Sequence, residues 1–304
     1  MTLNLDIDGL KSVVNDFDLF FIDIWGVVHN GVKLFKDAII TLDNLERLNK
    51  EYVLLTNAPR PNLAVEKYLI KIGLDEKKTK KVYTSGEAAL DYLLSELRNK
   101  KFFHIGSIKD FDLFKSFEKE KVKNLKEADY ILCTGLFDDH EENLDFYKKL
   151  LTSNLKKKMI CTNPDLVVDR GEKREYCAGT IAGLFNEMGG EVEYFGKPYY
   201  KIYKQASNIK GKKILCIGDN LNTDIRGANK QNFDSFLISD GIHKQEIINE
   251  KFEKIKKKYN VDVNYIQKKS YKRHLSLVLM LFKNLLLASI SSANARFLPL
   301  NNFS

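Results

Sequence analysis

Short apolar runs alternate with helix-like stretches along almost the whole chain, and this alternation limits the possible folds more than any other feature. The strand-like runs cover 19–24, 51–56, 102–106, 129–134, 158–162, 192–195, 213–218 and 234–238. The stretches with helical spacing between them cover 36–50, 60–73, 86–99, 141–155, 178–189 and 199–209. Such alternation predicts βαβ units and a mainly parallel sheet, so we expect an α/β fold.

Two of these apolar runs lead directly into carboxylates. The segment LFFIDIWGV at 19–27 carries Asp23, and the run at 213–218 is followed by Asp219 and Asp224. Ligands of open α/β sheets bind outside the carboxyl ends of the strands. Because Mg²⁺ prefers one or two carboxylates together with phosphate oxygens, these two loops predict a hard-metal centre.

Two further loops carry groups that suit phosphate. Thr56 and Asn57 end the run at 51–56, where a hydroxyl and amide groups can hold phosphate oxygens; a helix cap is the structural alternative. Lys197 follows the run at 192–195 and can neutralise charge on a nucleophile and on a phosphoryl group; an ordinary surface lysine is the alternative.

The order of the four loops (Asp, Thr, Lys, then the double-Asp loop) resembles the haloacid dehalogenase (HAD) superfamily. The resemblance runs from roughly residue 15 to residue 245. Its class IIA, NagD-like branch is matched by DIWGVVHNG, LLTNAPRP, TSGEAAL, CTNPDLVVDRG, AGTIAGLFNEMGG, FGKPYYKIY and IGDNLNTDIRGA.

The resemblance implies a Rossmann-like parallel-sheet core with an inserted α/β cap domain of the C2 type. We expect the core at 1–83 and 193–271, the cap at 84–192, and an apolar tail of undefined role at 272–304. The apolar stretch 275–290 is shorter than the roughly 20 residues of a membrane span, so no stable membrane insertion is expected. A packing helix or an interfacial helix fits it better.

The resemblance also implies a role for each loop. Asp23 matches the nucleophile, Thr56 with Asn57 beside it the phosphate-binding position, and Lys197 the catalytic lysine that also contacts phosphate. The metal ligands implied for Mg²⁺ are Asp23, the main-chain carbonyl of Trp25, Asp219 and Asp224. Family members are mostly Mg²⁺-dependent phosphatases, so we expect hydrolysis of a small phosphorylated metabolite through an aspartyl-phosphate on Asp23.

Trp25 departs from the family pattern, which usually has a second Asp two residues after the nucleophile. That Asp protonates the leaving alcohol, whereas an indole has only an N–H donor. Three explanations stay open: His29 replaces the acid, the substrate has a good leaving group, or the protein binds a phosphorylated ligand with little turnover. Cleavage of C–Cl or P–C bonds is known in relatives without the second Asp and is less favoured. The C–Cl-cleaving relatives need no Mg²⁺, so Asp219 and Asp224 would have no metal to hold, and the P–C-cleaving relative uses a Schiff-base lysine in a smaller cap of different type and position.

Three residues are candidates for substrate specificity. His29 serves as an acid or as a hydrogen-bonding residue of the flap. Asp165, in the predicted cap, contacts a substrate hydroxyl or amine, or else forms an Asx-turn. Arg60 reads a second anionic group or is solvated. The sequence does not separate sugar phosphates, nucleotides and phosphorylated cofactors.

Composition limits the partners and the compartment. The net charge of +8 comes from scattered lysines, which favours a solvated surface over substrate steering, and no motif indicates nucleic-acid binding. The four cysteines form no C-x-x-C pair and predict small buried side chains in a reducing compartment. The first residues lack a signal-peptide pattern, so a cytoplasmic protein is expected, with a homo-oligomer through the cap compatible with the family.

Overall fold

The computed structural model describes residues 1–140, 142–170 and 173–268, and it confirms the α/β fold with parallel sheets. The predicted tail at 272–304 lies outside the described residues. The helices are α1 (Lys36–Arg47), α2 (Asn62–Lys71), α3 (Glu76–Thr79), α4 (Ser85–Ser95), α5 (Leu144–Thr152), α6 (Ala178–Glu187), α7 (Tyr200–Ala206), α8 (Arg226–Lys230), α9 (Lys244–Asn249) and α10 (Phe252–Tyr259).

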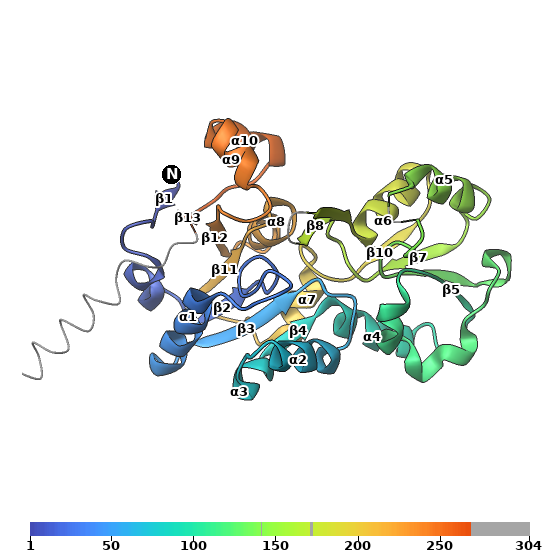
Figure 1. Ribbon diagram of the computed structural model, residues 1–304, viewed down its shortest axis with the longest axis horizontal. Helices are drawn as coiled ribbons and strands as arrows, with labels where there is room; N and C mark the ends of the chain where they lie inside the picture. The colour runs from blue at the N-terminus through green and yellow to red at the C-terminus, as the bar shows by residue number, and fades with distance from the viewer. Residues whose placement is uncertain (141, 171–172, 269–304) are drawn as a thin grey trace, which may run out of the picture.

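The larger sheet has seven strands, and every neighbouring pair is parallel. In spatial order they are β1 (Leu3–Asn4), β13 (Tyr265–Gln267), β12 (Asp234–Ile238), β11 (Ile214–Gly218), β2 (Leu19–Ile22), β3 (Glu51–Thr56) and β4 (Val82–Thr84). The carboxyl ends of β2, β3 and β11 therefore meet at one edge near the middle of the sheet (Figure 1).

Helices cover both faces of this sheet, which explains why its central strands are apolar throughout. On β2, Phe20 and Ile22 pack in the cluster that includes side chains of α1 and α2. Leu19 and Phe21 pack in the cluster that includes side chains of α4, α7 and α8. Successive side chains of a strand point to opposite faces, so a doubly covered strand has no polar face.

The smaller sheet has four parallel strands and lies beside the first (Figure 1). Its order is β10 (Val192–Tyr194), β7 (Lys158–Cys161), β6 (Tyr130–Cys133) and β5 (Phe102–Ile105). One buried cluster contains Phe21 of the larger sheet, Leu93 of α4, and Tyr130 and Ile160 of the smaller sheet. The two sheets thus share an apolar core in addition to their covalent links.

The boundaries between core and cap that the sequence suggests, at 83/84 and 192/193, stay a prediction. Strand β10 crosses the expected boundary at 193 and pairs with β7 in the smaller sheet, and α4 packs in the cluster shared by both sheets. An antiparallel hairpin, β8 (Val167–Arg170) and β9 (Lys173–Tyr176), extends from the segment after β7.

The expectation for the cysteines is confirmed: Cys133, Cys161, Cys177 and Cys216 are all buried free thiols. None of the helices in the described part of the chain has the length and apolar character of a membrane span.

A buried polar chain joins the smaller sheet to the loop after β3. His104 on β5 is 5% exposed, and its Nε2 lies 2.8 Å from Thr134 Oγ1. Thr134 donates its hydroxyl proton to Asp110 at 2.9 Å, and Arg60 Nε donates to Asp110 at 3.0 Å. Because Thr134 has one hydroxyl proton, His104 Nε2 must be the donor in its contact. Burial, with a smaller effect of Lys121, lowers the pKa of His104 to about 3.

We predict that this histidine makes stability fall in mild acid. Its folded-state pKa lies below the unfolded value near 6.5, so the unfolded chain binds more protons there. The stabilising contribution is complete above about pH 6.5 and is lost as the pH falls toward about 3, at up to about 1.4 kcal/mol per pH unit. Urea unfolding of wild type and His104→Gln at pH 7, 6 and 5 measures it.

His104→Gln should flatten the dependence of unfolding free energy on pH by that amount. Equal slopes in wild type and His104→Gln would contradict the prediction.

Candidate active site

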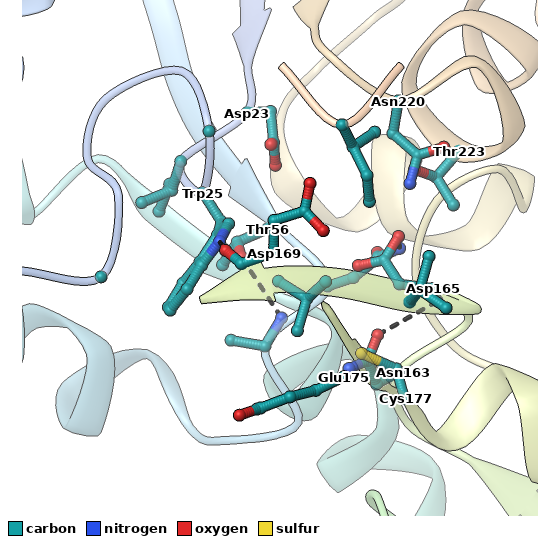
Figure 2. A pocket seen from close by; sticks show the side chains of 18 of the residues that line it. Asp23, Trp25, Thr56, Asn163, Asp165, Asp169, Glu175, Cys177, Asn220 and Thr223 are labelled. Atoms are coloured by element: carbon teal, nitrogen blue, oxygen red, sulfur yellow. Dashed lines mark hydrogen bonds between the residues drawn. The ribbon is translucent and has the colours of Figure 1, made fainter. Parts of the chain in front are cut away.

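Four chain segments bring the predicted site residues together at the carboxyl edge of the larger sheet (Figure 2). Asp23 follows β2, Thr56 ends β3, and Asp219 follows β11. Asp224 lies on a π-helical turn, Leu221–Ile225, and accepts the Asn220 N–H at 3.0 Å. π-helical turns are rare and often occur at functional sites, and this one turns Asp224 back toward the strand ends.

Lys197 links the acids of two segments. Its side chain is 5% exposed, and its ammonium donates to Asp23 Oδ1 at 2.5 Å, Asp224 Oδ1 at 2.7 Å and the Leu55 carbonyl at 3.0 Å. Burial by itself would lower the pKa of Lys197, but the carboxylates of Asp224 and Asp23 outweigh it and hold the pKa above its usual range. The lysine is therefore a fixed cation at the centre of the site.

The acids around this lysine fit a divalent cation. Asp23, Asp219 and Asp224 are buried, and each offers a carboxylate oxygen within 4.8 Å of the others. Burial raises the pKa of Asp23, with Lys197 opposing and the neighbouring acids adding to the shift. One ammonium against three carboxylates leaves excess negative charge, which is costly in a buried place without a further cation. An oxygen-only donor set suits a hard ion such as Mg²⁺.

The Thr56–Asn57 segment both faces the pocket and positions Lys197. The Asn57 side chain accepts the Lys197 N–H at 2.8 Å and donates to the Lys197 carbonyl at 3.0 Å and to Asp165 at 3.2 Å. Its amide is thus occupied by protein groups. The Thr56 hydroxyl accepts the Ala58 N–H at 3.3 Å and lies in the pocket lining, where it retains its own proton to donate.

Trp25 does not direct its indole N–H at Asp23. The indole Nε1 donates to the Asp169 carbonyl on β8 at 2.9 Å. Figure 2 shows Trp25 and Asp169 next to each other. The ring contacts His29 edge-on, with centroids 5.1 Å apart. A Cβ at Gly31 would lie 2.5 Å from the indole, so only glycine fits there. The assignment of the Trp25 carbonyl to the metal stays a prediction.

His29 lies in an aromatic cluster with Trp25 and Tyr68. It is 3% exposed, and its Nδ1 accepts the Gly31 N–H at 2.8 Å. Burial lowers the pKa of His29 to about 4, so the ring is neutral near pH 7. This geometry favours the hydrogen-bonding alternative over an acid in the reaction.

Asp165 reaches from the segment after β7 into the site. It receives hydrogen bonds from the Asn57 amide and the Thr223 hydroxyl. The Asx-turn is present as well, with Asn163 as its side chain: the Asp165 N–H donates to Asn163 Oδ1 at 3.1 Å. Loss of contact with water raises the pKa of Asp165 to about 6, with Lys197 opposing the shift.

Arg60 has a carboxylate partner instead of an open guanidinium. Its Nε donates to Asp110, which is almost fully buried, while the arginine side chain is 39% exposed. If Arg60 binds a second anionic group of the substrate, it does so through its other guanidinium N–H groups. This role stays a prediction.

All of these residues line one cavity of about 850 Å³. Sequence reasoning missed several of its other lining residues: Asp110, Thr134, Asp169, Glu175, Tyr176 and Cys177. For Asp169, Glu175, Tyr176 and Cys177 the signal was their position near the Asn-Pro-Asp segment, because β8 and β9 are too short to show a period. Asp110 and Thr134 lie far from that segment in sequence, and tertiary packing brings them to the cavity.

Comparisons with known proteins agree with this geometry. The sequence profile of the haloacid dehalogenase-like hydrolase family matches residues 20–119, and that of the HAD-hydrolase-like family matches residues 194–263. A 4-nitrophenylphosphatase of Schizosaccharomyces pombe is 28% identical over 277 residues, covering 79% of this chain and 90% of that protein. The 5'-nucleotidase YutF of Bacillus subtilis is 22% identical, covering 77% and 92%.

Solved structures share the fold. A p-nitrophenyl phosphatase from Archaeoglobus fulgidus has a TM-score of 0.63 at 21% identity, covering 82% of this chain and 95% of that one. A haloacid dehalogenase-like hydrolase from Brucella suis has a TM-score of 0.70 at 33% identity, covering 77% of this chain and 93% of that one. The resemblance to NagD-like, class IIA enzymes is confirmed, and the chain belongs to the haloacid dehalogenase-like hydrolase family.

Proposed function

We propose that the protein is a Mg²⁺-dependent phosphatase that hydrolyses a small phosphorylated metabolite through an aspartyl-phosphate on Asp23. The observation that carries this proposal is the Lys197 ammonium held between Asp23 and Asp224 at the strand ends. A nucleophile with a fixed cation beside it suits attack on an anionic phosphoryl group. The relatives named as 4-nitrophenylphosphatase, 5'-nucleotidase and phosphoglycolate phosphatase support the reaction class.

The reaction has two displacements at phosphorus. A carboxylate oxygen of Asp23 attacks, the bond from phosphorus to the leaving oxygen breaks, and Asp23 carries the phosphoryl group. Water then attacks the phosphorus, releasing inorganic phosphate and restoring the carboxylate. Lys197 offsets charge on Asp23 and the phosphoryl oxygens, and the Thr56 hydroxyl donates to one of those oxygens.

Asp23, Asp219, Asp224 and the Trp25 carbonyl would hold Mg²⁺ in this proposal. When bound, the ion neutralises charge on the phosphoryl oxygens. The division into core and cap, the cytoplasmic location and a homo-oligomer through the cap stay predictions of the same scheme.

We predict that activity on 4-nitrophenyl phosphate requires both the metal and Asp23. Chelation with EDTA should abolish it, and Asp23→Asn should lower kcat by roughly 10³ or more, because removal of a nucleophile typically has such effects. The exposed Asp145→Asn on α5 is the matched control and should keep wild-type activity. An Asp23→Asn protein as active as wild type would refute the proposal.

Trp25 predicts a steep dependence of the chemical step on the leaving group. Because its N–H is bonded to the Asp169 carbonyl, it does not protonate the departing oxygen. Aryl phosphates should react far faster than alkyl phosphates in single-turnover measurements. Trp25→Asp should raise the alkyl rate, by up to the acid–base factor of about 10²–10⁴.

Trp25→Phe, which also removes the indole N–H but adds no acid, is the control and should give no gain with alkyl substrates. Thermal unfolding must accompany both variants because the ring packs against His29 and Gly31. Comparable alkyl and aryl rates in wild type would show that another residue serves as the acid.

A second candidate function, favoured by Trp25 in place of the acid, is binding of a phosphorylated metabolite with little turnover. Calorimetry with phosphometabolites separates the two functions: tight binding of a ligand that stays intact for hours favours the binding protein. The paired Lys197 and the clustered acids favour the enzyme.

A further inference from the structure

The β8–β9 hairpin contacts two separate loops of the active site through two residues, Asp169 and Arg174. Its main-chain carbonyl accepts the Trp25 indole N–H at 2.9 Å, across 144 residues of sequence. Its carboxylate receives two bonds from Arg174 on the partner strand, Nε at 2.7 Å and Nη2 at 3.0 Å. Figure 2 shows Asp169 next to Trp25, in the cavity that Asp23 also lines.

Arg174 continues this connection to the loop that follows β12. Its Nη2 also donates to the Ile242 carbonyl at 2.9 Å, and the Ile242 N–H donates to Asp219 Oδ2 at 3.1 Å. The Asp219 carboxylate therefore accepts the N–H of the same residue, Ile242, whose carbonyl the hairpin binds.

The two loops enclose Asp219 closely. A Cβ at Gly26, one residue after Trp25, would lie 2.2 Å from Asp219 Oδ2, and a Cβ at Gly241 would lie 2.1 Å from the same oxygen. Because both loops touch this carboxylate, a shift of either loop changes where Asp219 points.

We propose that Asp169 and Arg174 are positioning residues that hold the Trp25 and Ile242 loops in the arrangement that binds the divalent cation. Docking of the hairpin and binding of the cation then favour each other. This inference rests on the metal centre of the proposed function. Trp25 in this chain therefore anchors the hairpin at the position where the family pattern has an acid.

The Asp169–Arg174 pair is unsuited to a mainly stabilising role. The two side chains are 40% and 56% exposed, and ion pairs in contact with water contribute little to folding. The two parallel hydrogen bonds of the pair instead fix how the two side chains are oriented toward each other. Coupling between two sites is reciprocal, so the cation must restrain the hairpin as much as the hairpin favours the cation.

Trp25 is the single tryptophan of the chain, so its fluorescence reports on this contact without any reaction. The experiment measures the Mg²⁺ Kd of the full chain by calorimetry and the quenching of Trp25 by acrylamide with and without Mg²⁺. In wild type, Mg²⁺ should reduce the quenching. In Arg174→Gln, the Mg²⁺ Kd should rise about fivefold or more, and Mg²⁺ should protect Trp25 less.

Asp169→Asn should raise the Mg²⁺ Kd as much as Arg174→Gln does. The double variant should raise the Kd little further, because both changes remove the same ion pair. Arg174→Lys keeps the charge but loses the two parallel N–H donors of the guanidinium, so its Mg²⁺ Kd should lie between those of wild type and Arg174→Gln. Arg47→Gln on α1, whose guanidinium also bonds a main-chain carbonyl and a side-chain oxygen, is the matched control and should bind Mg²⁺ as wild type does.

The melting temperature of each metal-free variant should stay at the wild-type value, which separates positioning from loss of folding. An Arg174→Gln Kd within twofold of wild type would overturn the coupling and leave the metal centre intact. A wild-type protein that binds no Mg²⁺ would instead overturn the proposed metal centre.

Discussion

The contact on which the rest of the site depends is the Lys197 ammonium between Asp23 and Asp224. Three buried carboxylates repel one another, and a lysine with carboxylates on two sides keeps its charge, so it permits the acids to lie together. Asn57 holds both the N–H and the carbonyl of Lys197, which fixes the main chain that carries the ammonium. In the proposed reaction this arrangement puts the nucleophile and the neutralising cation in place before a substrate arrives.

The smaller sheet contributes to the site through contacts that join it to the larger one. Lys197 follows β10 of the smaller sheet, Asp165 follows β7, and Asp110 pairs with Arg60 from the loop after β3. The apolar cluster shared by the two sheets supports these polar contacts, since well-packed cores resist small displacements. Segments of both sheets therefore line the cavity.

Sequence patterns predicted the parts of the molecule that depend on local periodicity. The apolar runs before Asp23, Thr56 and Asp219 indicated strands, and parallel strands place their carboxyl ends at one edge. Short strands outside the predicted apolar runs, such as β1 with two residues and β8 with four, were missed. The bond from Trp25 to Asp169 and the pair of Arg60 with Asp110 join distant segments, so only tertiary packing decides them. His29 was ambiguous for the same reason: its role depends on the rings packed around it.

The central claim is that Asp23 takes the phosphoryl group. Acid quench of the protein during turnover of 4-nitrophenyl phosphate, followed by peptide mapping, tests this most directly. The account predicts an acyl-phosphate on the peptide containing Asp23 in the presence of Mg²⁺, and none after chelation or in Asp23→Asn. Phosphate on a different residue, or steady turnover by Asp23→Asn, would contradict it.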